Sequence, residues 1–364
     1  MPSKYKVAII SSVEPWHAGG IERVIAKTSK RLKADFDMEI FCLGEKTGAV
    51  MWEEMPVNIF RRYGAIYPFS LSLYKELKRR IEQFALIHCY NWANFAPLVS
   101  ILANKGRVPI IFSPYFHPIA SQASYSIFRK FYDLTIGKYV FKNSDVLIYA
   151  SKAEREVVES RYGIEKNSFI IYDGADIAEF KSAEPYDLEG RNLILHLGRL
   201  KKYKNVHFII KAMKYLPDNF LLYIIGAGGY SSQLEELIRK LSLENRVKML
   251  GSVPDEEACR WMKTCSVFVH LSEIETFGIT CVEALAAGKP VVANDDGMGL
   301  AETARLFRDS ISLIDVKRRP IRDIAKLIKD ASQIDVNPDL NGFDWIDKAE
   351  RIKDVYLDVL RRKL

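Results

Sequence analysis

The chain has 364 residues, of which 48% are hydrophobic and 27% charged, and its net charge is +7. This composition excludes a disordered or fibrous chain, and the length suits two domains of ordinary size. No apolar run reaches the roughly 20 residues that span a bilayer, and the N-terminal one is too short for a secretory signal. Five scattered cysteines show no metal-binding spacing, so we expect a reduced, cytoplasmic protein.

Short apolar runs alternate with amphipathic segments along the chain. The runs expected to form strands are 6–10, 38–43, 86–90, 109–113 and 145–150, and later 193–198, 220–226, 247–251, 266–271 and 290–294. Because these runs are continuously apolar, they indicate sheets that are covered on both faces. The alternation of strands and helices indicates parallel, doubly wound sheets.

A polar stretch with several turn signals, 172–192, separates the two series of strands. We therefore expect two doubly wound α/β domains of the Rossmann-like type, 1–175 and 190–343. The amphipathic segment 344–364 is expected to form a helix that packs back on the first domain. A ligand is expected in a cleft between the domains, at the carboxyl ends of strands.

The segment 275–283, ETFGITCVE, places two carboxylates eight residues apart. Glu275 falls in the loop after a strand, and Glu283 lies about two turns into the next helix, at roughly 3.6 residues a turn. That helix begins with residues whose amides lack an intrahelical acceptor: Gly278, Ile279 and Thr280. Such amides and the helix dipole form an anion site. The alternative is that Glu275 caps the helix and Glu283 is a solvated residue.

A basic loop, HLGRLKKYKN (196–205), follows the first strand of the second series. Arg199 offers a fork of donors and Lys204 a point charge, which together suit a pyrophosphate. The alternative is a solvated basic loop, and we expect the neighbouring Lys201 and Lys202 to be solvated.

Three glycine-containing turns also follow strands. Gly19 and Gly20 allow close approach of a ligand to the backbone, although a plain tight turn explains them equally well. Gly226, in IIGAGG, and Val253, in GSVPDEE, fit a nucleotide half-site in which backbone groups hold the base.

Histidines occur at three strand ends or interiors. His117, in IFSPYFHP, follows a strand and is flanked by prolines that stiffen its loop, so it is a candidate hydrogen-bond donor to a ligand. The alternative is a structural histidine. We expect His88 and His196, which lie within or at the end of apolar strands, to be structural.

The order GGIERV, GRLKKYKN, IIGAGG, GSVPDEE and ETFGITCVEALAAGKPVVAN resembles the retaining, nucleotide-sugar-dependent glycosyltransferases of family 4 (glycosyl transferases group 1), which have the GT-B fold. The resemblance covers nearly the whole chain. It implies that Glu275 faces hydroxyls of the donor sugar and that Glu283 holds the ribose. The residues implied as catalytic are Glu275, His117, Arg199 and Lys204. Those implied as donor-binding are Gly19, Gly20, Gly226, Val253, Phe277, Gly278, Ile279, Thr280 and Glu283.

Three departures from the family pattern stand out. The first glutamate lies in E-T-F-G rather than E-G-F-G, and the segment 173–176 is DGAD where the family often has N-G-V-D. After the last strand the family has a Gly-Gly pair before a glutamate, whereas this chain has NDDGMGLAE, with Glu302 in the place of that glutamate. The last departure concerns the sugar end of the pocket.

The resemblance implies that the anomeric configuration is retained and that a nucleoside diphosphate, UDP or GDP, leaves. Cations and a helix terminus stabilise such a leaving group, so we expect no metal requirement and no other cofactor. Two alternatives remain. A nucleotide-sugar 2-epimerase shares the fold and needs acid–base side chains at the sugar, and a non-catalytic module would bind nucleotide sugars without turnover.

The charge of the chain is concentrated in residues 61–142, which hold twelve Lys or Arg against three acids. Basic residues alternate with aromatic ones in 67–84 and 125–142, as in helices that lie on an anionic membrane. This pattern favours peripheral contact with the inner face of the membrane and a hydroxyl acceptor that is lipid-linked or lipid-embedded. The alternative is a set of core aromatics with a solvated cationic face. No nucleic-acid-binding motif accompanies the charge, and we expect no such partner.

Overall fold

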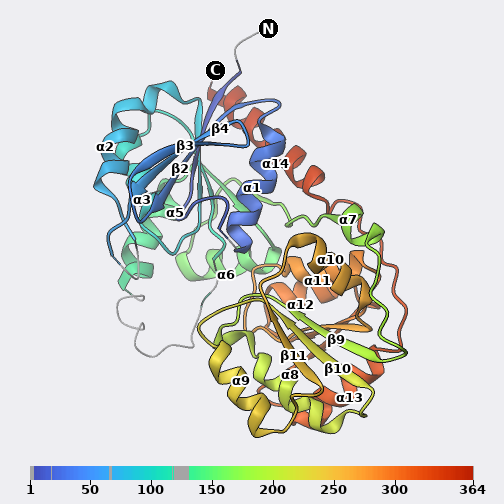
Figure 1. Ribbon diagram of the computed structural model, residues 1–364. Coiled ribbons are helices and arrows are strands. Elements are labelled where there is room, and N and C mark those ends of the chain that lie inside the picture. Colours follow the sequence, from blue (N-terminus) through green and yellow to red (C-terminus); the bar gives the residue numbers. More distant parts are fainter. Residues whose placement is uncertain (1–3, 18, 65–67, 117, 119–130, 364) are drawn as a thin grey trace. The chain divides into compact units, whose positions relative to one another are not determined.

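The computed structural model of the chain describes residues 4–17, 19–64, 68–116, 118 and 131–363 (Figure 1). The chain divides into two compact units, Met1–Gly174 together with Trp345–Leu364, and Ala175–Asp344. Each unit is an α/β layer structure built on one largely parallel sheet, and the predicted fold class is confirmed. Among the described residues, no helix has the length and apolar character needed to cross a membrane.

The first unit contains an eight-stranded sheet in the order β3-β4-β2-β1-β5-β6-β7-β8. All neighbouring strands are parallel except β3 and β4, which form an antiparallel pair. The strands are β1 (Lys6–Ile10), β2 (Asp37–Gly44), β3 (Gly48–Trp52), β4 (Met55–Arg61), β5 (Leu86–Tyr90), β6 (Ile110–Ser113), β7 (Val146–Tyr149) and β8 (Ser168–Ile170). The strand order reverses at β1, between β2 and β5, which makes the end of β1 a topological switch point.

Helices cover the sheet of the first unit on both faces. They are α1 (Gly20–Leu32), α2 (Leu71–Arg80), α3 (Ala96–Asn104), α5 (Lys138–Asn143), α6 (Lys152–Tyr162) and α14 (Trp345–Lys363), with a short 3-10 turn η1 (Ile81–Gln83) and a π-helical turn η3 (Asp133–Gly137). Buried residues of α2, α3, α5 and α6 share one core cluster with the strands. The helix α1 packs beside α14 (Figure 1).

The second unit contains a six-stranded, wholly parallel sheet in the order β11-β10-β9-β12-β13-β14. The strands are β9 (Asn192–Leu197), β10 (Phe220–Ile225), β11 (Val247–Gly251), β12 (Val267–His270), β13 (Val291–Asn294) and β14 (Ile311–Ile314). The helices are α7 (Ile177–Ser182), α8 (Val206–Ala212), α9 (Ser231–Lys240), α10 (Asp255–Thr264), α11 (Ile279–Ala286), α12 (Gly299–Leu306) and α13 (Ile321–Ala331), with 3-10 turns η4 (Lys202–Lys204) and η5 (Met213–Tyr215).

Four strands were not predicted, and each lacks a long continuous apolar run. The edge strand β3 is exposed along most of its length, and its partner β4 alternates between buried and partly exposed residues. The strands β8 and β14 have only three and four residues. The polar stretch 172–192, which separates the two series of strands in the sequence, contains α7, whose single buried residue, Phe180, gives no visible helical period.

Candidate functional site

The centre of the second sheet brings two polar loops together. The neighbouring strands β9 and β12 are parallel, and the strand order reverses between them. In open α/β sheets, the crevice at the carboxyl ends of two such strands is the usual binding position. The loop 198–205 leaves β9 and carries the predicted cations, and the loop 271–278 leaves β12 and carries Glu275.

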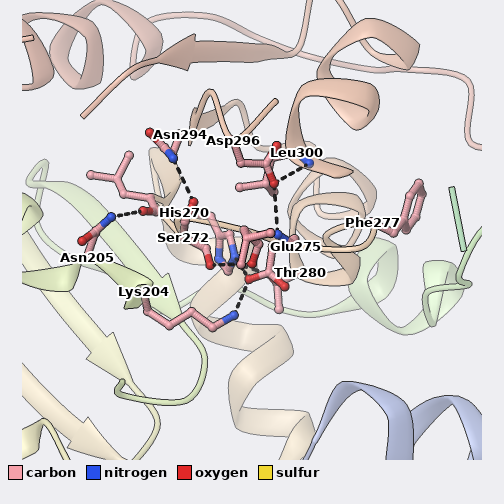
Figure 2. Close-up of polar contacts among 12 residues, drawn as sticks. Lys204, Asn205, His270, Ser272, Glu275, Phe277, Thr280, Asn294, Asp296 and Leu300 are labelled. Atoms are coloured by element: carbon pink, nitrogen blue, oxygen red, sulfur yellow. Dashed lines mark hydrogen bonds and ion pairs between the residues drawn. The ribbon is translucent and has the colours of Figure 1, made fainter. Parts of the chain in front are cut away.

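Glu275 and Lys204, from these two loops, form an ion pair in which Nζ of the lysine contacts Oε1 of the glutamate (Figure 2). Nε2 of His270, the last residue of β12, lies 2.9 Å from the same oxygen atom. The Lys204 and Glu275 side chains are 10% and 21% exposed. Among the described residues, none forms a hydrogen bond with Oε2 of Glu275, so this oxygen atom remains available as an acceptor.

The electrostatics of the cluster favour a charged carboxylate and a neutral imidazole. Burial opposes ionisation of Glu275, but the charge of Lys204 and the hydrogen bond from His270 outweigh burial and hold the pKa of the carboxyl well below its usual range. Burial lowers the pKa of His270, against the opposing influence of Glu275. Nε2 of a neutral His270 therefore donates to the carboxylate. Nδ1 lies 3.5 Å from Oγ1 of Thr280.

The backbone of Glu275 is held from both sides by the turn that follows β13. Its amide donates to Oδ2 of Asp296 at 3.0 Å, and its carbonyl oxygen accepts from the amide of Gly299 at 3.1 Å. Asp296 also accepts the amides of Met298 and Ala301 near the start of α12, at 2.8 and 3.1 Å. The carboxylate of Asp296 thereby joins the start of one helix to the loop that carries Glu275 (Figure 2).

Two buried side-chain amides fix the chain where it leaves β12. Nδ2 of Asn205 donates to the carbonyl oxygen of Leu271, and Nδ2 of Asn294 donates to that of Ser272, both at 3.0 Å (Figure 2). Because Asn205 comes from the loop after β9 and Asn294 is the last residue of β13, all three neighbouring strand ends are linked.

The start of α11 lies in the same cluster. Its N-cap residue is Gly278, with a positive φ of 104° and no side-chain cap, so the alternative that Glu275 caps this helix is wrong. Ile279 and Thr280 follow in the first turn and are partly exposed. Phe277 is buried and its ring stacks on Phe343, which makes its side chain part of the core.

Glu283 lies in the middle of α11, and its side chain is fully buried, at 0% exposure. The alternative that it is a solvated surface residue is therefore wrong. A buried carboxylate carries a large desolvation cost, which distinguishes Glu283 from an ordinary helix glutamate.

The other predicted residues of the second unit lie at the same edge of its sheet. Arg199 is exposed in the loop after β9, and its side chain makes no hydrogen bond or ion pair with another described residue. Gly226 has a φ of 127°, and a Cβ atom there would overlap the carbonyl oxygen of Gly198. A glycine at this position therefore allows the backbones of the loops after β9 and β10 to pack in close contact. Val253 is half-buried after β11, three strands from β12.

The predicted residues of the first unit lie after β1 and β6. Gly19 is the N-cap residue of α1 and Gly20 is its first residue, at the switch point of the first sheet. His117 lies outside the described residues. His88 is structural as expected, since it is buried and its ring nitrogens contact Tyr356 at 2.7 Å and Ser113 at 2.8 Å.

His270 and Asp296 were not singled out from the sequence. His270 is the penultimate residue of the apolar run 266–271 and comes five residues before Glu275, a spacing that gives the only local signal of its role. Asp296 is 21 residues from Glu275 in the sequence and meets it only through the fold. Among the described residues, no group of three or more His, Cys, Asp or Glu side chains is arranged to hold a metal ion.

Two family models match the chain, one in each half. The model of glycosyl transferases group 1 matches residues 178–335, and the model of glycosyltransferase family 4 matches residues 18–179. Together they span most of the chain.

Curated relatives agree with these matches. An uncharacterized glycosyltransferase of Methanocaldococcus jannaschii is 28% identical, over 82% of this chain and 71% of its own length. The N-acetylgalactosamine-N,N'-diacetylbacillosaminyl-diphospho-undecaprenol 4-alpha-N-acetylgalactosaminyltransferase of Campylobacter jejuni is 26% identical, over 80% of this chain and 81% of its own length.

Solved structures show the same fold. Anabaena HepE, in a complex with UDP and glucose, superposes with a TM-score of 0.76 at 21% identity and covers 96% of this chain and 99% of its own. The sucrose-phosphate synthase of Thermosynechococcus elongatus superposes with a TM-score of 0.79 at 17% identity, covering 98% and 100%. The fold is therefore that of GT-B glycosyltransferases.

Proposed function

Because this chain belongs to the group 1 and family 4 glycosyltransferases, we propose that it moves a sugar from a nucleoside-diphosphate sugar to a hydroxyl acceptor and retains the anomeric configuration. Glycosyl transfer itself follows from the family. The donor class is supported by HepE, whose structures contain UDP with glucose and UDP-glucose. The observation that carries the proposal is the meeting of Lys204 and Glu275 at the switch point of the second sheet.

The proposed leaving group is a nucleoside diphosphate that binds beside the loop after β9. The guanidinium of Arg199 is exposed and unpaired among the described residues, so it is available to a phosphate. Nζ of Lys204 already lies beside Glu275, and the start of α11 adds amides and the positive end of a helix dipole. These groups stabilise negative charge that develops as the glycosidic bond breaks.

Glu275 is proposed to bind hydroxyls of the donor sugar. Its Oε1 atom is occupied by Lys204 and His270, whereas Oε2 is available to accept hydrogen bonds. The depressed pKa of Glu275 keeps the group an acceptor at neutral pH. The ribose contact proposed for Glu283 requires neighbouring residues to move, because its side chain has no exposed surface.

Retention is proposed to proceed by attack of the acceptor on the face from which the phosphate departs. A phosphate oxygen of the leaving group takes the proton of the acceptor hydroxyl, so no side chain acts as a covalent nucleophile. The positive groups are proposed to replace a metal ion in this step, and the rate should be unchanged by a chelator.

The acceptor is proposed to be lipid-linked or held at a membrane. The name of the Campylobacter relative describes a diphospho-undecaprenol acceptor. A relative in Streptococcus pneumoniae is named an alpha-monoglucosyldiacylglycerol synthase and is 24% identical over 58% of this chain and 52% of its own length. The basic segment 61–142 of this chain supports contact with an anionic membrane.

The proposal can be tested by a thermal-shift screen of nucleoside diphosphates and their sugars, since a donor that binds the folded state raises its melting temperature. Hydrolysis of the best donor is then followed for the wild type, Glu275→Gln and Glu273→Gln. Glu273 lies in the same loop but pairs with Lys317 at 3.5 Å, which makes it a matched control.

Turnover should fall by about 10²–10³-fold in Glu275→Gln and stay near wild type in Glu273→Gln. NMR of the product should show the anomeric configuration of the donor. Equal turnover in both variants, conversion of the donor to an epimer without an acceptor, or an inverted product would each contradict the proposal.

A further inference from the structure

Three helices of the first unit present cations and apolar side chains on one outer surface. The helix α2 contacts α3, and α3 contacts α5, so they form a layer on one face of the sheet (Figure 1). We call this surface the α2–α3–α5 face. Its exposed apolar residues are Tyr63, Phe69, Leu71, Phe131, Leu134 and Tyr139. Its exposed or half-exposed lysines are Lys75, Lys78, Lys105, Lys138 and Lys142.

The apolar residues of this face are unusually exposed. Leu71, Phe131 and Leu134 are 64%, 64% and 67% exposed. Burial of a large apolar side chain is favourable, so several such residues on one surface indicate an interaction site rather than a solvated helix layer.

A chain of aromatic contacts connects exposed Tyr63 and Phe69 to the buried ring of Tyr132. The ring of Tyr63 lies 6.0 Å from that of Phe69, Phe69 lies 6.3 Å from Phe95, and Phe95 lies 5.5 Å from Tyr132. The amide of Phe95 also donates to the carbonyl oxygen of Pro68 at 3.1 Å. Two of the six exposed apolar residues are thus anchored to the core of the unit, and we call the six together the apolar rim of this face.

The order of residues along the helices places three of the lysines at helix ends. The strands that precede α2, α3 and α5 are parallel to one another, so the helix starts lie at the carboxyl edge of the sheet. Leu71 is the first residue of α2, whereas Lys78 lies in the last turn of α2, Lys105 follows the end of α3 and Lys142 lies in the last turn of α5. Lys75 lies within α2 and Lys138 begins α5. We call these five lysines the basic band.

The basic band has little internal compensation. Its five lysines make no ion pair with any other residue that the structure describes. Glu76 pairs with Arg79 at 2.6 Å, and Glu82 lies 3.9 Å from Arg107. The third acid of the segment, Asp133, is buried and pairs with Arg161. The face presents a positive field to its partner.

We infer that the α2–α3–α5 face docks on an anionic lipid bilayer, with its apolar rim at the headgroup–acyl boundary and its lysines among the lipid phosphates. A polyanion such as nucleic acid explains the lysines but gives no gain from exposed Leu71 and Leu134. A bilayer accommodates both. The inference rests on the proposed function only in one respect, namely that the membrane presents the acceptor. Docking on the bilayer does not require that a nucleotide-sugar donor is bound.

The test is co-sedimentation of the full chain with vesicles of phosphatidylcholine alone, or of equal parts phosphatidylcholine and phosphatidylglycerol. Two variant sets separate charge from apolar insertion. The first set removes three positive charges from the face with the substitutions Lys75→Gln, Lys105→Gln and Lys142→Gln. Its control removes three positive charges from exposed positions of the second unit with the substitutions Lys214→Gln, Lys240→Gln and Lys329→Gln.

The second set changes the apolar rim. Leu71→Ser with Leu134→Ser removes two exposed side chains, and the control pair, Leu306→Ser with Ile334→Ser, removes two exposed side chains of the second unit. All four positions are on the surface, so these changes should leave folding intact, which circular dichroism checks.

The wild type should bind the anionic vesicles, lose binding in high salt and ignore the neutral ones. Each lysine near the membrane surface should contribute about a factor of five in vesicle affinity. The lysine triple variant should therefore bind anionic vesicles on the order of a hundredfold more weakly than the wild type. The apolar pair should weaken binding at low and high salt alike, and both controls should match the wild type.

Equal binding to both vesicle types, absence of binding at low salt, or equal losses in the second-unit controls would overturn the docking face. Stronger binding to a DNA duplex than to anionic vesicles would do the same. Thermal-shift measurements with nucleoside-diphosphate sugars on the same samples report the donor site separately, so loss of docking and failure of the proposed reaction are distinguishable.

Discussion

Nε2 of His270 lies 2.9 Å from Oε1 of Glu275, the oxygen atom that also pairs with Lys204. The histidine therefore orients a carboxylate whose other oxygen atom is available. His270 is buried and contacts Glu275 and, at 3.5 Å, Oγ1 of Thr280, so we expect its effect on catalysis to pass mainly through Glu275.

Replacement of His270 should be visible in the pH dependence of turnover. His270→Ala removes one of the interactions that hold the pKa of Glu275 low, so that pKa should rise toward its ordinary value. The acid limb of the pH profile of kcat/KM should then move to higher pH. The loss of activity relative to the wild type should be smaller at pH 8 than on the acid limb. A rate profile from pH 4 to 8 measures this shift.

His207→Ala is the control for this profile, because His207 is a partly buried histidine of α8 outside the cluster. His270→Gln, which keeps a donor, should restore part of the wild-type profile. A uniform loss of activity at every pH would show that His270 has only a structural role.

Removal of the Asp296 charge should loosen the Glu275 loop. This carboxylate accepts the amides of Glu275, Met298, Leu300 and Ala301, and Asn offers only one acceptor oxygen. Asp296→Asn should lower the free energy of unfolding of the second unit by about 2–4 kcal/mol, since hydrogen bonds to charged groups contribute about 1.5–3 kcal/mol each. It should also lower kcat.

Urea unfolding and steady-state kinetics measure the two effects of this change. Asp295→Asn is the matched control, because Asp295 is the exposed neighbour and accepts only a long contact of 3.4 Å from Gly297. Equal behaviour of the two variants would remove the role assigned to Asp296.

The fold class was predictable because strands buried on both faces appear as continuous apolar runs. The site was predictable in part: Glu275 and Lys204 meet because each lies in the loop that follows a central strand. Asp296 was not predictable, since its contact with Glu275 depends on how the turn after β13 packs against the loop after β12. The edge strand β3 was missed because an exposed strand has no buried pattern to detect.

A methyl group at Gly226 should destabilise the second unit. The residue has a positive φ, and the added Cβ atom would overlap the carbonyl oxygen of Gly198, a backbone atom that cannot turn away. Gly226→Ala should lower the free energy of unfolding by about 2 kcal/mol or more. Gly229→Ala, three residues later, meets open space and should change it by less than about 0.5 kcal/mol. Urea denaturation of both proteins decides the matter.

Acid should destabilise the protein through its buried histidines. Burial lowers the pKa of His88 to about 3, whereas the unfolded chain binds the proton near 6.5. The unfolded state is therefore increasingly favoured as the pH falls below 6.5. At pH 4.5, protonation of His88 in the unfolded chain should lower the free energy of unfolding by about 2–3 kcal/mol.

His88→Gln should reduce the difference in unfolding free energy between pH 7 and pH 4.5 by that amount, as measured by urea unfolding at both values. An unaltered pH dependence in His88→Gln would mean that His88 is protonated in the folded protein.

The chain leaves the first unit after Gly174 and returns at Trp345, so the second unit is an insertion within the first. Its two terminal residues, Ala175 and Asp344, pair through a backbone bridge and are therefore neighbours. A polypeptide of residues 175–344 thus has neighbouring ends. The two segments of the first unit require no more than a short linker peptide to be joined. We therefore expect that each unit can be produced as a separate polypeptide.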